Sequence, residues 1–542
     1  MDKKIKVNKI NFVRIIDYRG VTETDNFKAN AEQDRHTFLC QPCFMQRGGY
    51  LILDFGKEIC GRLHVKFGWT EKPGNVRIRL GESVAETCAE LGEKNAGNYH
   101  SLRDNEYHAV PWGDISTSES GFRFVRIDAL DEVAVLTVVY AEEAGNGLTI
   151  KSGFKCSDER LNDIYKVAER TLSLCVREDD IWDGIKRDRV YWTGDFYPEL
   201  IGAYLLYGDI PQLEKALCGI KQFDGRWVNN IPSYSAWWII CLEKYYDLSA
   251  NKGLADKLMP YLDKVVNDFS VIIKENGDIS YDDSELEYFK DNEFFIDWPT
   301  NYTADSEIGW RYLLTYAMQK AKRLYDLFGK KNETVNVILE RLDKYDYKPS
   351  DFKQVTALGV MAGKIGKEEA SKLLKHNGVE GMTCFMGFAI IEALRIAGEG
   401  EYALKLIKEY YGAMIDMGAT TFWEDFDVDW LKDNPLPIDA LPDKTRKNIH
   451  ADYGKFCYKG LRHSLCHGWS SGFIEFFYGY VLGVTKTEPG YKQIKVESHL
   501  CGLNYAEGEI PTCYGTIRVK HTLSDGRINT EISVPDGIEI IR

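Results

Sequence analysis

The sequence predicts a multidomain fold in which a large barrel of helices lies between an N-terminal β-sandwich and a small C-terminal β domain. Two changes in the spacing of apolar residues carry this prediction. Apolar and polar residues alternate over about the first 145 residues, apolar residues then recur at helical spacing from about residue 156 to 483, and alternation returns afterwards. The predicted domains are residues 1–147, 148–483 and 484–542.

The N-terminal region is predicted to be β structure because its apolar residues occupy every second position. Leu63, Val65 and Phe67 form one such run, with polar neighbours between them. Short strands of this kind, separated by glycine-bearing turns, typically close as a β-sandwich. The polar segment 142–147 contains two glycines and is the predicted end of this domain.

The middle region is predicted to be helical. In its first segment the apolar residues from Leu161 to Leu172 fall on one helical face, and Ser157 is a candidate N-cap. Further helical segments are expected at residues 253–269, 368–375 and 402–417. More than 300 residues of this pattern without a short repeat favour a closed barrel of helices over a solenoid.

The C-terminal region returns to strand spacing. Ser524-Asp525-Gly526-Arg527 has the composition of a tight hairpin turn, and alternating apolar residues stand on both sides of it. We therefore expect a small β domain after Gly483.

Composition excludes several classes of protein. Apolar residues make up 44% of the chain and charged residues 28%, which is typical of a globular enzyme. The formal charge of −15 would repel a polyphosphate, so nucleic acid is not an expected partner. No apolar run reaches the roughly 18 residues that a membrane span requires, so no membrane partner is expected either.

The expected location is the cytoplasm. The N-terminal residues contain no apolar stretch followed by a cleavage site, and the 13 cysteines are odd in number and spread along the chain. Such cysteine usage is typical of a reducing compartment. The sequence leaves a homo-oligomer open.

The densest polar segment of the helical region is residues 183–195. It contains Asp183, Asp188 and Asp195, interspersed with cations, and the aromatic residues around it are of the kind that is usually buried. Cations can hold one acid ionised while a neighbouring acid in an apolar setting keeps its proton, which is the division of labour that acid/base catalysis needs. From these local features alone, a structural ion-pair network is an equally good interpretation.

Two further segments follow or precede helices in the same way. Glu424 stands beside Trp423 after the helix that ends near Met417, where a carboxylate could activate a water molecule. His467 precedes an apolar helix and could donate a hydrogen bond to a sugar hydroxyl or orient a carboxylate. Alone, each segment is more simply interpreted as local packing, but helix connections gather at the ends of a barrel, where the three could form one cleft.

Tryptophan is concentrated in the helical region, which contains ten of the twelve in the chain. Indole rings stack well on the C–H faces of sugars. Trp237 is a candidate for this role, although Trp237 and Trp238 cannot both face one cleft if their segment is helical.

The spacing Asp-x-x-x-Arg-Asp-x-x-x-Trp-Thr-Gly-Asp from Asp183 to Asp195 resembles the signature loop of the α-L-rhamnosidases of glycoside hydrolase family 78. Residues 418–424 resemble the second carboxylate motif of that family, and residues 51–63 are similar to a strand pair ahead of its barrel. The resemblance covers nearly the whole chain in the same domain order. It implies a central (α/α)6 barrel and an inverting glycoside hydrolase that releases terminal α-L-rhamnose. We expect no cofactor and no metal.

The resemblance also implies roles for individual residues. Asp188 stands at the position of the general acid and Glu424 at that of the general base. The implied substrate-binding residues are Asp183, Arg187, Trp192, Asp195 and His467, and Trp237 and Trp423 are further candidates because of their indole rings. The family usually has glutamate at the position of Asp188, and because aspartate is one methylene shorter, Asp195 is a second candidate for the proton donor.

Other kinds of site have weaker support in the sequence. Cys40 and Cys43 have C-x2-C spacing, but a closed zinc site needs four ligands and the sequence offers no second pair. Nucleophilic serine or cysteine motifs and phosphate-binding loops are absent from the sequence. A hydrolase or lyase of the same fold acting on another sugar, such as a uronide, and a non-catalytic carbohydrate-binding protein remain as alternatives.

Overall fold

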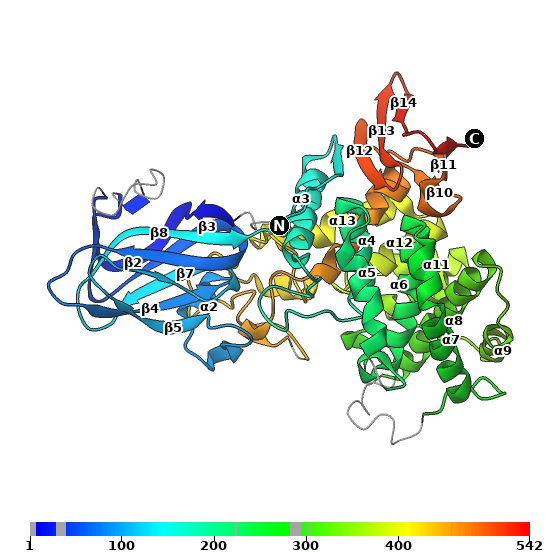
Figure 1. Ribbon diagram of the computed structural model, residues 1–542, viewed down its shortest axis with the longest axis horizontal. Helices are drawn as coiled ribbons and strands as arrows, with labels where there is room; N and C mark the ends of the chain where they lie inside the picture. Colours follow the sequence, from blue (N-terminus) through cyan, green and yellow to red (C-terminus); the bar gives the residue numbers. More distant parts are fainter. Residues whose placement is uncertain are drawn as a thin grey trace.

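The computed structural model describes residues 7–541, apart from 26, 29–39, 223–224, 282–293, 302 and 457. A β-rich N-terminal domain lies at one end of an elongated molecule, helices form the other end, and a small sheet projects from the helices (Figure 1). The order of β, α and β regions agrees with the prediction. None of the described helices is long and apolar enough to cross a membrane.

The N-terminal domain is built on one long strand. The strand β3 pairs with β2, β6, β7 and β8, and β1, β4 and β5 complete an eight-stranded sheet. The alternating residues Leu63, Val65 and Phe67 point into a core that belongs to this domain alone. The elements are β1 (Val7–Asn11), β2 (Arg14–Thr22), β3 (Cys43–Phe67), β4 (Gly74–Gly81), α2 (Val84–Cys88), η2 (Glu93–Asn95), β5 (Asp104–Ala109), β6 (Asp114–Ser116), β7 (Ser120–Ala129) and β8 (Ala134–Ala144).

The helical domain has an inner ring. Around it α4, α6, α8, α10, α12 and η10 each pack against the next, and η10 packs against α4. The elements are α3 (Glu159–Cys175), α4 (Phe196–Tyr207), α5 (Pro211–Cys218), η3 (Gly219–Gln222), η4 (Val228–Asn230), α6 (Pro232–Ser249), α7 (Lys252–Ile272), η7 (Trp298–Thr300), α8 (Ala304–Leu327), α9 (Glu333–Leu342), α10 (Lys353–Met361), α11 (Lys367–Lys375), α12 (Gly387–Ala397), α13 (Gly400–Asp416), η8 (Val428–Asp433), η9 (Gly460–Arg462), η10 (Gly468–Ile474) and η11 (Phe477–Val481).

The start of α3 differs from the prediction by one residue. Asp158, rather than Ser157, is the N-cap, because its carboxylate accepts hydrogen bonds from the backbone nitrogens of Arg160 and Leu161, at 2.9 and 3.3 Å. The hydroxyl of Ser157 instead accepts a bond from the backbone nitrogen of Asn504 in the C-terminal domain.

One strand of the C-terminal sheet comes from the segment that precedes the first long helix in the sequence. Strand β9 (Gly153–Cys156), which lies in the predicted barrel domain 148–483 just ahead of its first expected helix, pairs with β12 (Tyr505–Thr512). The predicted hairpin turn is confirmed between β13 (Gly515–Ser524) and β14 (Arg527–Ser533), where Asp525 and Gly526 both have positive φ. The remaining elements are β10 (Val484–Lys486), η12 (Pro489–Tyr491), β11 (Gln493–Val496) and β15 (Glu539–Ile540).

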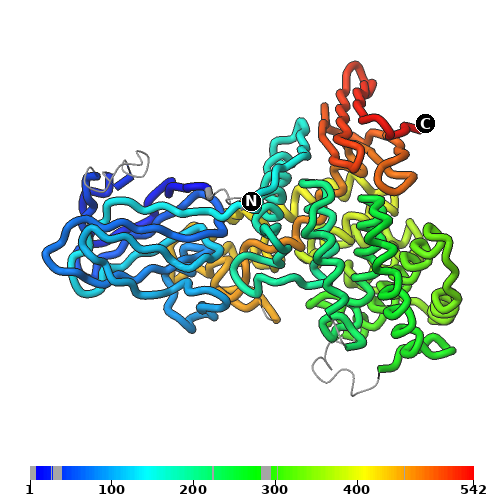
Figure 2. The backbone as a smooth tube through the Cα atoms, viewed as in Figure 1, coloured from blue at the N-terminus to red at the C-terminus, as the bar shows by residue number. Residues whose placement is uncertain are grey.

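The segment ahead of η10 joins the two large domains. Figure 2 shows the orange chain before residue 468 running beside the β domain. The backbone nitrogen of Val84 donates to the carbonyl of Ile438 at 2.8 Å, and Lys94 forms an ion pair with Asp452 at 2.6 Å. The β domain is therefore in direct contact with the chain that leads into His467.

Candidate active site

The three polar segments singled out in the sequence meet at one place. The backbone nitrogen of Gly468 donates to the carbonyl of Asp183 at 2.8 Å, and that of His467 donates to the carbonyl of Phe422 at 2.9 Å. The backbone nitrogen of Glu424 donates to Ser464 at 2.9 Å. Backbone hydrogen bonds thus hold segments that are far apart in the sequence against one another.

These segments surround a cavity of about 170 Å³. Pockets for drug-sized ligands usually measure about 300–1,000 Å³, so this cavity suits a single small ring. Seven of the predicted site residues line it. They are Asp183, Arg187, Asp188, Trp192, Asp195, Glu424 and His467.

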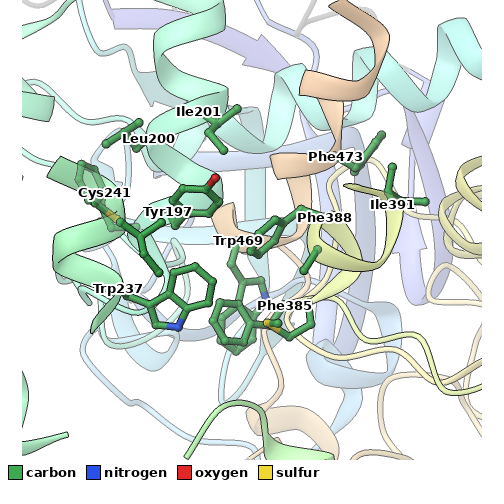
Figure 3. Close-up of a cluster of buried hydrophobic side chains, with 14 of the residues drawn as sticks. Tyr197, Leu200, Ile201, Trp237, Cys241, Phe385, Phe388, Ile391, Trp469 and Phe473 are labelled. Carbon is green, nitrogen blue, oxygen red and sulfur yellow. The ribbon is translucent and has the colours of Figure 1, made fainter. Parts of the chain in front are cut away.

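Two predicted residues do not line the cavity. Trp237 is buried in a cluster with Tyr197, Phe385 and Phe388 (Figure 3). Trp423 is also buried, against Phe426 and the ring of His463. Both side chains pack in the core and therefore do not face the cavity.

The sequence did not single out six other lining residues. These are Ile231, Tyr234, Phe295, Trp298, Tyr458 and Trp469. Trp469 lies two positions from His467, and its ring stacks on Phe385 of the core cluster at 4.9 Å between centroids. Its nearness to His467 was a signal in the sequence. Tyr234 lies in the first turn of α6, and the remaining four come from segments between the long helices, so only the closed ring of helices determines that they meet.

One arginine links the two proposed catalytic carboxylates. Arg187 donates to Asp188 at 2.7 Å through Nη1 and to Glu424 through Nη2. Glu424 also accepts a bond from the backbone nitrogen of Ser464 at 2.9 Å. The side chain of Glu424 is 4% exposed and that of Asp188 27%, so Asp188 lies nearer to solvent than its partner.

The backbone at Asp188 is strained. Asp188 and Arg189 have φ values of 55° and 57°, in the left-handed region that residues other than glycine seldom occupy. Such conformations cost about 1–3 kcal/mol each and persist where the surrounding structure imposes them. On the outer side, Nε2 of His100 from the β domain is 3.4 Å from Oδ1 of Asp188.

Burial changes the acidity of the deeper groups. It raises the pKa of Asp183 and of Asp195 well above the usual value, and the negative charges of Asp188 and Asp183, respectively, raise it further. Burial also raises the pKa of Glu424, although the nearby charge of Arg187 opposes this effect. Several carboxylates thus share one cavity, an arrangement in which at least one acid readily keeps its proton.

His467 lies among these acids as a neutral ring. Its Nε2 is 3.7 Å from Glu424 and 3.9 Å from both Asp183 and Asp195. Burial, followed by the charge of Arg187, lowers its pKa well below the usual value. A neutral imidazole can donate one hydrogen bond and accept another, which suits a sugar hydroxyl.

Two groups of described residues bring three metal-type ligand atoms within 4.8 Å of one another. Asp183, Asp195 and His467 form one group in the cavity, and Glu82, Glu86 and His450 form the other. In the second group Nζ of Lys186 is 2.9 Å from Glu86 and 3.4 Å from Glu82, so an ammonium already stands where a cation would bind. Cys40 and Cys43 belong to neither group.

Comparison with known proteins finds similarity to α-L-rhamnosidases. Residues 483–540 match the model of the bacterial α-L-rhamnosidase C-terminal domain. Over 537 residues the chain is 22% identical to an α-L-rhamnosidase of Alteromonas sp. (strain LOR), covering 90% of this chain and 55% of the relative. The chain spans about half the length of that relative.

Solved structures extend the likeness to the whole fold. The family 78 rhamnosidase of Bacillus sp. GL1 superposes with a TM-score of 0.71 and 20% identity, covering 93% of this chain and 53% of its own. A rhamnosidase from Klebsiella oxytoca, solved with rhamnose bound, superposes with a TM-score of 0.67 and 18% identity, covering 88% of this chain and 96% of its own. The fold of this chain is thus similar to that of the α-L-rhamnosidases. Its rhamnosidase-like fold includes the C-terminal sheet as well as the helices that carry the cavity.

Proposed function

We propose that this chain is an inverting glycoside hydrolase that releases terminal α-L-rhamnose from a glycoside. The observation that carries the proposal is the pair Asp188 and Glu424, held by one arginine in a cavity of single-ring size. The rhamnosidase-like fold supports it. We further propose that residues 148–483 form an (α/α)6 barrel, since the inner ring has six members, and that residues 1–147 form a β-sandwich and residues 484–542 a separate β domain.

In this proposal Glu424 is the general base. Arg187 and the backbone nitrogen of Ser464 both favour its ionised form, because each donates a hydrogen bond to the carboxylate. Burial raises its pKa, which makes the carboxylate a better proton acceptor. Glu424 would take a proton from water as the water attacks the anomeric carbon.

Asp188 is the proposed general acid. The leaving group must depart through the mouth of the cavity, and Asp188 is more exposed than Asp183, Asp195 or Glu424. It would protonate the glycosidic oxygen while Glu424 receives the water proton, as inversion requires. Asp195 is the competing donor, because burial raises its pKa and so keeps its proton in place.

The other lining residues would hold the sugar. Trp192, Trp298 and Trp469 offer indole faces to C–H groups and to the methyl of a deoxy-sugar. Asp183 and His467 offer polar atoms to its hydroxyls. Among the residues that the structure describes, the lining contains one arginine. Its two terminal nitrogens already bind carboxylates, and this favours a neutral sugar over a uronide.

The test compares leaving groups. Rhamnosides whose aglycones are good leaving groups need little protonation, whereas alkyl rhamnosides depend on it. We would measure kcat/KM for both kinds of rhamnoside, and for aryl uronides, with the wild type and with Asp188→Asn, Asp195→Asn and Glu424→Gln. Asp163→Asn is the matched control, because Asp163 is an exposed residue outside the cavity.

The wild type should hydrolyse rhamnosides and leave uronides intact. Asp188→Asn should lose about 10²–10⁴-fold on alkyl rhamnosides and far less on activated ones, and Glu424→Gln should lose activity on both. If Asp195→Asn shows the leaving-group dependence instead, Asp195 is the donor. Wild type that hydrolyses no rhamnoside would refute the proposed function.

A further inference from the structure

A buried lysine lies next to the proposed catalytic loop. Lys186 precedes Arg187, and its ammonium contacts two carboxylates of the β domain, Glu86 at 2.9 Å and Glu82 at 3.4 Å. All three side chains are at most 5% exposed. The β domain therefore reaches into the helical domain at the position beside Arg187.

The same ammonium binds the segment that carries the other half of the site. Nζ of Lys186 donates to the carbonyl of Leu461 at 2.6 Å and to that of His463 at 2.7 Å. Glu82 binds this segment as well, since it accepts the backbone nitrogen of Leu465 at 2.7 Å and the hydroxyl of Ser464 at 3.3 Å.

Lys186, Glu82 and Glu86 form a buried network that is linked to the proposed catalytic groups in two ways. Arg187, adjacent to Lys186, binds Asp188 and Glu424, and its Nε donates to the carbonyl of Arg462 at 3.3 Å. Ser464, which Glu82 contacts, donates its backbone nitrogen to Glu424. The network thus fixes two loops whose separation sets the distance between Asp188 and Glu424.

A buried network of this kind is a costly way to stabilise a fold. Removing charges from water costs about as much as their attraction returns, so apolar residues of similar volume would often serve stability as well. What apolar residues could not supply is the set of directed hydrogen bonds from Lys186 to two carbonyls. Directionality is useful where loops must be held in one geometry.

We propose that Lys186, fixed by Glu82 and Glu86 of the β domain, is a positioning residue that sets the geometry between the Arg187–Asp188 loop and the Glu424–Ser464 contact. The β domain is then part of the active-site scaffold and not only an accessory module. The effect on catalysis rests on the proposed function, whereas the effect on the loops does not.

The experiment separates positioning from stability. Lys186→Met removes one of the two cations that face the buried carboxylates of Glu82 and Glu86, the other being Arg103, so it should both destabilise the protein and lower kcat. The double variant Lys186→Met/Glu86→Gln also removes one carboxylate charge. The amide introduced by Glu86→Gln still offers an oxygen to Arg103, whose Nη2 is 2.5 Å from the carboxylate in the wild type.

The double variant should regain most of the lost thermal stability. Its kcat on a rhamnoside should nevertheless stay roughly tenfold or more below that of the wild type, with a smaller change in KM, because misplaced catalytic groups slow the chemical step. The bonds from Lys186 to Leu461 and His463 are still missing in this variant.

Lys94→Met is the matched control. Lys94 forms an ion pair with Asp452 across the same two domains, but this pair is partly exposed and lies outside the cavity lining. Its kcat should equal that of the wild type. If the double variant regains both stability and kcat, the network serves stability alone and the inference is wrong.

Hydrogen exchange supplies a readout that needs no substrate. The backbone nitrogens of Ser464 and Leu465 are bonded to Glu424 and Glu82, and exchange of a peptide covering residues 462–468 should be faster in the double variant than in Lys94→Met. Faster exchange in a protein that hydrolyses no glycoside would leave the positioning role standing and the proposed function refuted. Unchanged exchange and unchanged kcat in an active protein would refute the positioning role.

Discussion

Two cavities lined by charged residues lie at opposite ends of helix α6, and the pKa values of their acidic residues are shifted in opposite directions. Tyr234, in the first turn of α6, lines the proposed active site, whereas Glu243 and Asp247 near the end of α6 line a second cavity of about 300 Å³. In the second cavity Arg323 is 2.8 Å from Asp247, and Lys486 is 3.2 Å from it. Nearby cations, with Lys486 foremost among them, hold the pKa of Asp247 well below its usual value despite burial.

At the active-site end, burial outweighs the nearby positive charge. It raises the pKa of Asp183, Asp195 and Glu424, and Asp188 occupies a strained backbone position. A charged cavity is therefore not by itself a sign of chemistry. We interpret buried acids whose pKa is raised as a sign of a functional site, and buried acids whose pKa is lowered by nearby cations as a structural feature.

The largest expected effect is the loss of the proposed base. Glu424→Gln should lower kcat on a rhamnoside about 10³-fold or more, because the mechanism assigns activation of the water to this carboxylate. Steady-state kinetics and a thermal melt would measure it together. Activity near that of the wild type would remove Glu424 from the mechanism.

Next comes a change at the opposite end. Asp247→Asn should destabilise the protein by about 1–3 kcal/mol, since it removes the carboxylate charge that Arg323 and the largely buried Lys486 both face. The folded pKa of Asp247 is lowered, so its contribution is present above the unfolded pKa of about 3.9 and is lost as the pH falls further. Urea unfolding at pH 7 would measure the loss, while kcat should stay unchanged. A fall in kcat without a loss of stability would show that the cavity around Asp247 also takes part in catalysis.

Replacing aspartate by asparagine at Asp195, in the proposed active site, should stabilise the protein. The folded pKa of Asp195 is raised, so the unfolded chain loses this proton at lower pH than the folded one, and stability falls as the pH rises above about 4. Asp195→Asn removes that penalty. We expect a gain of roughly 1–2 kcal/mol at pH 8 and less at pH 5, measured by urea unfolding at both values. A loss of stability at pH 8 would show that Asp195 is as well satisfied as Asp247.

The smallest expected effect is at the mouth of the cavity. Nε2 of His100 is 3.4 Å from the carboxylate of Asp188, and the His100 side chain is 46% exposed. His100→Gln should lower kcat/KM by about two- to fivefold, in keeping with the small energies of exposed contacts. His108→Gln is the control and should change nothing, because His108 lies in the same domain but contacts Asn75 instead of Asp188.

The parts of the fold that could be predicted are those whose patterns are local. The hairpin at Asp525-Gly526 follows from residues that tolerate positive φ, and the helix from Leu161 follows from its spacing. Strand β9 was missed because its partner β12 lies beyond the whole helical region, where no local pattern reports the pairing. The acidic segments were recognisable by composition, but Trp298 and Tyr458 line the cavity only because the ring of helices brings their connections together.

Trp237 is the converse case, a residue that was predicted to bind the sugar but lies in the core. Its residue type suits a sugar site, yet its position on α6 turns it toward Tyr197 and Phe388 in the core. The direction in which a side chain faces can be deduced from periodicity only where polar positions break the pattern. In α6 every residue from Pro232 to Leu242 is buried, so periodicity could not distinguish a core face from a cleft face.

The stereochemistry of the first product tests the central proposal most directly. Proton NMR during the first minutes of hydrolysis of an α-L-rhamnoside would show which anomer is released before mutarotation mixes the two. Direct attack by a water that Glu424 activates predicts β-L-rhamnose as the first product. Release of α-L-rhamnose would mean a covalent intermediate and would contradict the assigned roles of Asp188 and Glu424.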